Sequence, residues 1–155
     1  MAGVLGTALT GSARPAEGQL SFRGSCGPVL CIPAERGWFG SVGPGVTAGH
    51  SAAWLLTGNF RFPADAAKHE ATPSVPRGKA LISIGDFPLT GRSLHWPRVQ
   101  RLRLPQRRLA HRVVSWHVRF AGRAVPLSVH FGSAPNAGSR SLVNARLSAI
   151  RRDRG

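Results

Sequence analysis

The chain has 155 residues, of which 42% are apolar and 17% charged, and its formal net charge is +15. A chain of this length can bury roughly two-thirds of the surface that it exposes when unfolded, so we expect one self-sufficient domain. The apolar content excludes a disordered chain, and no apolar run approaches the ~18 residues that cross a bilayer, so we predict no transmembrane segment.

The positive charge attracts polyanions in general, but its composition makes it weak evidence for a dedicated phosphate-binding protein. Of the 21 basic residues only Lys68 and Lys79 are lysines, and a GC-rich genome produces such a preference for arginine without selection for phosphate binding. We therefore expect a solvated basic surface. The charge allows a polyanion or an anionic surface as partner, and a nucleic acid is the less favoured choice.

Residues 1–19 are rich in glycine, alanine, threonine and serine, which is typical of a flexible lead or the remnant of a signal peptide. A single α+β domain is predicted at 20–152, followed by a tail at 153–155. Cys26 and Cys31 are the only cysteines. In an exported protein they would close a small disulfide loop, whereas in a cytosolic protein they would stay reduced, and the sequence leaves both alternatives open.

The first half of the chain predicts short strands separated by turns. Residues 20–46 alternate apolar pieces with turn signals, which indicates short strands. Residues 53–62 predict a strand with one apolar face, and 63–71 predict a short helix. Residues 78–87 predict a second strand. Residues 98–104 alternate arginine with leucine between two prolines, which predicts an edge strand.

Residues 113–133 predict a β-hairpin, because apolar and polar residues alternate on both sides of a turn. A two-residue loop at Gly122 and Arg123 would pair Phe120 with Val125. This register turns eight apolar side chains to one face, namely Val114, Trp116, Val118, Phe120, Val125, Leu127, Val129 and Phe131.

Residues 139–152 predict a helix that packs on the sheet. Its serines can cap the start, its arginines favour the C-terminal end, and one stripe is apolar. The predicted fold class is α+β, an antiparallel sheet of about five strands with this helix packed on it and a short helix between strands. The predicted core contains Trp54, Phe60, Ile82, Ile84, Trp116, Val118, Phe120, Leu127, Val129, Phe131, Leu147 and Ile150.

The basic run at 92–112 is the candidate polyanion-binding segment. An edge strand would present part of it, and a following turn would add the rest, forming a patch that could follow a phosphate backbone. Only Trp96 is available to stack on bases, and no known nucleic-acid-binding motif is present. The six candidate residues are Arg98, Arg101, Arg103, Arg107, Arg108 and Arg112.

Three other motifs favour structural interpretations. The segment "GHSAA" around Ser51 resembles the start of a nucleophile elbow, but Ala53 replaces the last glycine, so a turn is the better interpretation. Asp86 follows an apolar strand, where we expect an ion pair with an arginine rather than a catalytic base. His117 and His130 share the outer face of the hairpin, diagonally placed, but no carboxylate lies near them in the sequence. We assign no catalytic residue, metal site or cofactor.

Several apolar segments in order resemble a family of small exported proteins. These are "IPAERGWFG", "AWLLTGNFRF", "PRGKALISIGDF", "VVSWHVRFAGRAVPLSVHFGS" and "LVNARLSAIRR", and the resemblance covers about residues 28–152. They resemble uncharacterised exported α+β proteins of high-GC bacteria and, more distantly, the PsbP-like sandwich. The resemblance implies an antiparallel sheet flanked by helices and an accessory role outside the cytoplasm, and it implies no catalytic residues.

The first functional hypothesis is therefore a non-enzymatic, exported binding or accessory domain whose ligand the sequence does not identify. The alternative is a basic nucleic-acid-binding protein that uses the arginines of 92–112, and the second alternative is a small hydrolase. The expected localisation is extracytoplasmic, with the cytoplasm as the alternative.

Overall fold

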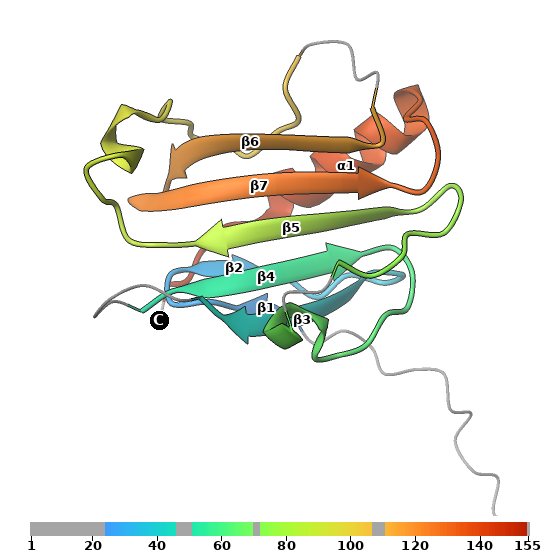
Figure 1. The fold of residues 1–155 in the computed structure, drawn as a ribbon, viewed down its shortest axis with the longest axis horizontal. Coiled ribbons are helices and arrows are strands. Elements are labelled where there is room, and N and C mark those ends of the chain that lie inside the picture. Colours follow the sequence, from blue (N-terminus) through green and yellow to red (C-terminus); the bar gives the residue numbers. More distant parts are fainter. Residues whose placement is uncertain (1–23, 46–50, 70–71, 107–110, 155) are drawn as a thin grey trace, which may run out of the picture.

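The computed structural model describes residues 24–45, 51–69, 72–106 and 111–154, and its largest element is a five-stranded antiparallel sheet. The strand order is β3, β4, β5, β7 and β6, from bottom to top in Figure 1. The bounds in that order are Phe39–Pro44, Ala53–Gly58, Ala80–Asp86, Arg123–Phe131 and Val113–Phe120.

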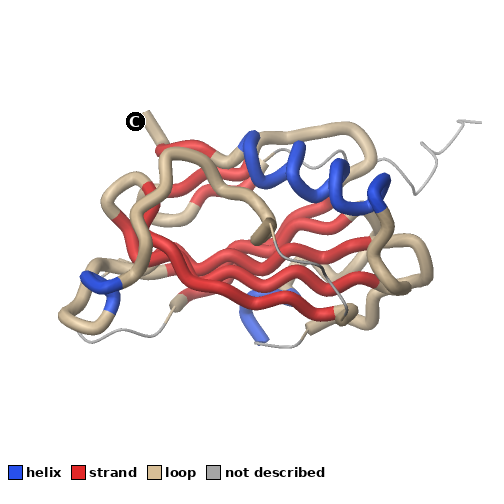
Figure 2. The backbone as a smooth tube through the Cα atoms, turned by 90° about the horizontal axis from the view of Figure 1, so that it is seen from above, coloured by secondary structure: helices blue, strands red, loops and turns tan. Residues whose placement is uncertain are grey.

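A smaller sheet and the helix α1 (Ala137–Ala149) lie on one face of the large sheet (Figure 2). The small sheet has the order β1, β2, β8, with bounds Ser25–Cys26, Leu30–Ile32 and Arg151–Arg152. The 3₁₀ turn η1 (Ala66–His69) lies on the opposite face, and a second one, η2 (Ser93–His95), follows β5. The predicted α+β class, with about five antiparallel strands and a packed C-terminal helix, is confirmed.

The hairpin of β6 and β7 has the predicted faces but a different register. Val118 pairs with Val125 and Phe120 with Arg123, so the predicted pairing of Phe120 with Val125 is wrong by two residues. The loop is Ala121 and Gly122, and both have positive φ, 52° and 79°, as the favoured two-residue hairpin turn requires. A shift of two residues keeps every side chain on its face, so the eight apolar side chains still pack on the main core.

Strand β4 is shorter than predicted, and both of its faces are covered. Leu55 belongs to the main core, whereas Leu56 and Phe60 belong to a second cluster around η1. The apolar face predicted from the alternation at 53–62 is therefore the face that packs on the smaller cluster, and the opposite face packs on the main core. Trp54, predicted in the core, is only half-buried and packs edge-on against Phe87, with ring centroids 5.1 Å apart.

Residues 98–104 do not form the predicted edge strand. Arg98 makes one isolated parallel bridge to Arg119 of β6, after which the segment leaves the sheet edge. Leu102 and Leu104 are buried in the main core, and the Leu104 amide donates to Asn144 Oδ1 of α1 at 2.8 Å. The alternation of leucine with arginine thus reflects an irregular segment that packs against the core. Its leucines point inward and its arginines are exposed to solvent.

The C-terminal helix begins and ends earlier than the predicted 139–152. Asn136 caps it: its side chain accepts from the Ser139 amide, and Ser139 Oγ accepts from the Asn136 amide, both at 2.8 Å. The helix ends at Ala149, and the arginines predicted for its last turn form β8 instead. The prediction was wrong there because their backbone groups pair with β2, a contact distant in sequence.

The remaining predicted core residues are buried, except that Trp116 is half-buried against the main core. The short helix expected at 63–71 corresponds to η1, of which Ala66–His69 is described. The predicted lead at 1–19 lies outside the described residues. Within the described part of the chain, none of the helices combines the length and apolar character needed to cross a bilayer.

Candidate anion-binding site

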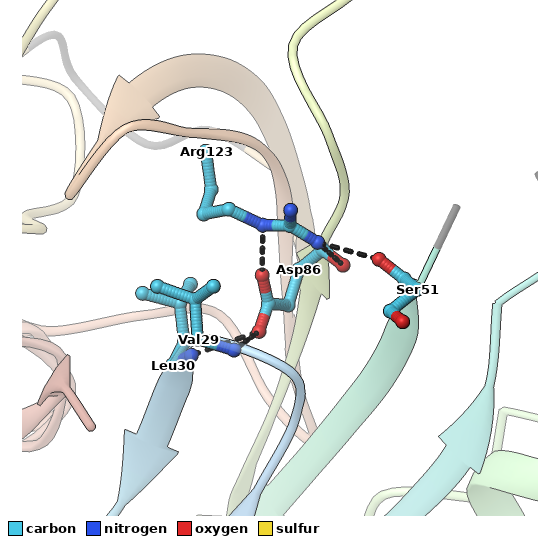
Figure 3. Close-up of polar contacts among 5 residues, drawn as sticks. All are labelled: Val29, Leu30, Ser51, Asp86 and Arg123. Carbon is cyan, nitrogen blue, oxygen red and sulfur yellow. Dashed lines mark hydrogen bonds and ion pairs between the residues drawn. The ribbon is translucent and has the colours of Figure 1, made fainter. Parts of the chain in front are cut away.

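The carboxylate of Asp86 at the end of β5 is fully buried and joins three segments: β5 itself, the start of β2 and the start of β7 (Figure 3). Its Oδ2 accepts from the amides of Val29 and Leu30 at 2.7 and 2.8 Å, and its Oδ1 accepts from Arg123 Nε at 2.6 Å. A buried charge is tolerated only when it is paired and hydrogen-bonded, and Asp86 meets both conditions. The expected ion pair with an arginine is therefore present.

Arg123 extends this network to the segment that precedes β4. Its Nη2 donates to the Asp86 carbonyl at 3.1 Å and to the Ser51 carbonyl at 2.7 Å. Ser51, weighed above as a nucleophile, thus contributes a backbone carbonyl here. The network fixes the start of β7, and with it the turn at Ala121 and Gly122, relative to β5 and β2.

Three arginines from distant segments surround a hollow beside that turn. Arg98, Arg119 and Arg152 line it, together with Leu89, Val99 and Phe120, and its volume is about 600 Å³. We call it the Arg98 hollow. Arg98 and Arg152 are exposed, and Arg119 is half-buried. Among the described residues that line the hollow, none is acidic.

The walls of the Arg98 hollow are held by backbone hydrogen bonds. The Val99 amide donates to the Arg119 carbonyl at 2.9 Å, and the Arg119 amide donates to the Pro97 carbonyl at 2.8 Å. Arg119 Nε donates to the Trp96 carbonyl at 2.8 Å, which restrains the guanidinium. These contacts join the segment carrying Arg98 to the end of β6.

Arg152 is positioned through β2 and thus through Asp86. It pairs with Leu30 in the small sheet, and the next amide, that of Asp153, donates to the Val29 carbonyl at 2.6 Å. Val29 and Leu30 are the residues whose amides bind Asp86. The buried Asp86 carboxylate therefore positions two walls of the hollow, namely the turn before β7 and the strand β8 that carries Arg152. Its negative charge is paired with Arg123.

Such a hollow is suited to hold an anion. Guanidinium groups donate to phosphate and carboxylate oxygens in two-pronged geometry, and a site with an apolar floor and no carboxylate weakens the competition from water and from acidic side chains. Its volume of about 600 Å³ lies within the range of small-molecule sites and is ample for an anionic group.

Of the six arginines predicted as a polyanion-binding patch, the structure describes four, and these lie on different parts of the molecule. Arg98 lines the hollow, whereas Arg101 and Arg103 are exposed on the irregular segment that packs against the core. Arg112 is exposed at the opposite end of β6, roughly 20 Å from Arg119 by the rise of a strand. Arg107 and Arg108 lie outside the described residues.

Sequence reasoning missed Arg119 and Arg152 as members of a site. Arg119 has the same parity as His117 and so falls on the predicted outer face of the hairpin, and Arg152 falls at the end of the predicted helix 139–152. Their only signal in the sequence is charge, which they share with every other arginine. Their convergence depends on the pairing of β8 with β2, which no local sequence pattern predicts.

A second hollow, of about 880 Å³, lies on the other side of Arg152 and contains the disulfide between Cys26 and Cys31. The two sulfur atoms and a carboxylate oxygen of Asp153 lie within 4.8 Å of one another. Metal binding by cysteine requires thiolates, and these sulfurs are bonded to each other, so the cluster is not a metal site in this state.

The two histidines weighed as a metal pair are not neighbours. His117 pairs with Pro126, whereas His130 pairs with Val113, which lies four residues before His117 in β6. His117 packs against Trp96, with ring centroids 4.7 Å apart. His130 Nε2 lies 3.4 Å from Ser128 Oγ, and partial burial lowers the pKa of His130. The shifted register therefore removes the diagonal contact that was expected.

Comparisons of the chain with protein-family models, with curated proteins and with solved structures found no match.

Proposed function

We propose that the chain is a non-enzymatic binding or accessory domain that works outside the cytoplasm and holds an anionic ligand at the Arg98 hollow. The observation that carries the proposal is that Arg98, Arg119 and Arg152 line one hollow together with apolar side chains, and that none of the described lining residues is acidic. The Asp86 network supports it, because that network positions the walls without placing a free carboxylate in the site.

Localisation outside the cytoplasm is supported by the disulfide, since such bonds persist in oxidising compartments. Intact-mass measurement of the aerobically purified chain, with and without reductant, tests this part. We expect the mass without reductant to be lower by the two thiol hydrogens. Free thiols at Cys26 and Cys31 after aerobic purification would argue for the cytoplasm.

Calorimetric titration with pyrophosphate at about physiological salt tests the anion site. We expect the double variant Arg98→Ala/Arg152→Ala to bind about ten-fold more weakly or worse, because each change removes a charge-assisted hydrogen bond. The control, Arg77→Ala/Arg112→Ala, removes the same charge from exposed positions outside the lining of the hollow. Equal losses of affinity in both variants would mean that pyrophosphate is attracted only by the overall positive charge of the protein. The proposed anion site would then be wrong.

A further inference from the structure

We propose that the loop beside the Arg98 hollow docks on an anionic phospholipid bilayer, with Leu89 and Leu94 entering the interface and the arginines of the hollow holding a headgroup phosphate. This inference rests on the proposed anion site and names its ligand. It depends on exposed apolar side chains, on the hydrogen bonds of the loop that presents them, and on the charges around them.

Two exposed leucines lie five residues apart in the loop between β5 and the Arg98 bridge, and the Leu94 amide donates to the carbonyl of Thr90, the residue after Leu89. Leu89 is 37% exposed and lines the hollow, and Leu94 is 51% exposed on η2. The other large hydrophobic residues exposed in the described chain, Val113 and Leu142, lie at the start of β6 and on α1. Figure 1 shows the loop projecting beyond the end of the sheet at the left.

The loop holds Leu94 outward by a fixed set of hydrogen bonds. Ser93 is buried; its Oγ donates to the Thr90 carbonyl at 2.9 Å and accepts from the Thr90 amide at 2.7 Å. The Leu94 amide also donates to the Thr90 carbonyl, at 3.1 Å. Because Ser93 occupies the inward position of the turn, Leu94 is left in solvent, where an apolar side chain gains from reaching an interface.

The charges of the same segment match an anionic surface. Arg92, Arg98 and Arg101 are exposed along it, and the sequence from 88 to 101 contains no acid. Trp96 lies half-buried between them, and tryptophan favours the level of lipid headgroups. Apolar tips flanked by arginines suit a bilayer better than a nucleic acid, because leucines find no apolar layer on a phosphate backbone.

Flotation of the full chain with vesicles tests the proposal. Vesicles of phosphatidylglycerol mixed with phosphatidylcholine are compared with pure phosphatidylcholine at about physiological salt. We expect binding to the anionic vesicles only, and a fall of about ten-fold in the partition coefficient for Leu89→Ser/Leu94→Ser. The matched control is Leu142→Ser, which removes a leucine 40% exposed on α1 and should bind like the unchanged chain.

The outcomes separate this proposal from the anion site itself. Pyrophosphate binding that depends on Arg98 and Arg152, without vesicle binding, would keep the anion site and overturn the bilayer proposal. Vesicle binding that the leucine variant leaves intact would reduce the contact to general charge attraction and also overturn it. Tighter binding to DNA than to anionic vesicles, insensitive to Leu89 and Leu94, would favour a nucleic-acid partner instead. Loss of both pyrophosphate and vesicle binding would overturn both proposals.

Discussion

In the part of the chain that the structure describes, two ion pairs between an arginine and a carboxylate join distant segments, and opposite partners are buried in them. In the pair of Arg123 with Asp86, the carboxylate is fully buried and the arginine side chain is 14% exposed. In the pair of Arg146 with Glu35, the guanidinium is fully buried and the carboxylate is 50% exposed. The first pair therefore has to compensate for the desolvation of a carboxylate, and the second for the desolvation of a guanidinium.

The buried carboxylate relies on backbone donors that no side-chain substitution removes, whereas the buried guanidinium relies largely on side chains. Arg146 Nε and Nη2 donate to Thr57 Oγ1 at 3.2 Å, and Nη1 donates to Glu35 Oε2 at 2.8 Å. Its Cζ also lies 5.1 Å from the centre of the Trp38 ring. Burial lowers the pKa of Arg146, and the Glu35 carboxylate opposes that shift. The comparison indicates that Asp86 should tolerate substitution less well than Arg146.

The largest effect should come from Asp86→Ala. This change leaves two buried amides and the Arg123 guanidinium without their acceptor, so the free energy of unfolding should fall by about 3–5 kcal/mol. Urea denaturation at neutral pH measures the change. The control is Asp65→Ala, which removes an exposed carboxylate paired with His69 and should leave the stability unchanged. Similar losses in both variants would mean that the network does not set the stability of this end of the sheet.

A smaller loss is expected for Arg146→Ala, about 2–4 kcal/mol, because it removes both the charge contacts and the packing of a long side chain. Arg146→Met should lose less, since methionine fills the space against Trp38 and has no charge to desolvate. Denaturation of the two variants side by side measures the difference. If methionine were as damaging as alanine, the guanidinium contacts rather than the packing would dominate.

Glu35→Gln should have a still smaller effect, at most about 1 kcal/mol, because the carboxylate is half-exposed and water screens it. Raising the salt concentration should reduce even this difference. Urea denaturation at low and high salt gives the answer. A loss as large as that of Asp86→Ala would remove the distinction drawn between the two pairs.

The smallest effect should be the pH dependence from His130, a partly buried group whose hydrogen-bond contact, Ser128, is uncharged. Burial lowers the pKa of His130 below its ordinary 6.5. Near that pH the unfolded chain therefore binds more protons, so stability falls as the pH drops through 6.5 and levels off below the folded-state pKa. His130→Gln should flatten this slope between pH 7 and 5, while His111→Gln, an exposed control, should leave it in place.

The candidate site was predictable from sequence only in part. Arg98 was chosen from a basic run, and Asp86 was expected to pair with an arginine because it follows an apolar strand. The basic run did not predict the arrangement of its side chains. Alternating leucine and arginine at 98–104 is equally compatible with an edge strand and with an irregular segment that packs its leucines into the core. The convergence of Arg119 and Arg152 required β8 to pair with β2, which the helical interpretation of 139–152 excluded.

The local residue pattern was enough to assign the side chains of the hairpin and of α1 to their faces, because a period of two or 3.6 residues fixes their direction locally. The tertiary structure decided the hairpin register, since a slip of two residues preserves that pattern and the observed register places Arg123 beside the buried Asp86. It also decided that β4 is covered on both faces and that Arg151 and Arg152 leave the helix. These features depend on partners distant in the chain, whose burial and hydrogen bonds override local preference.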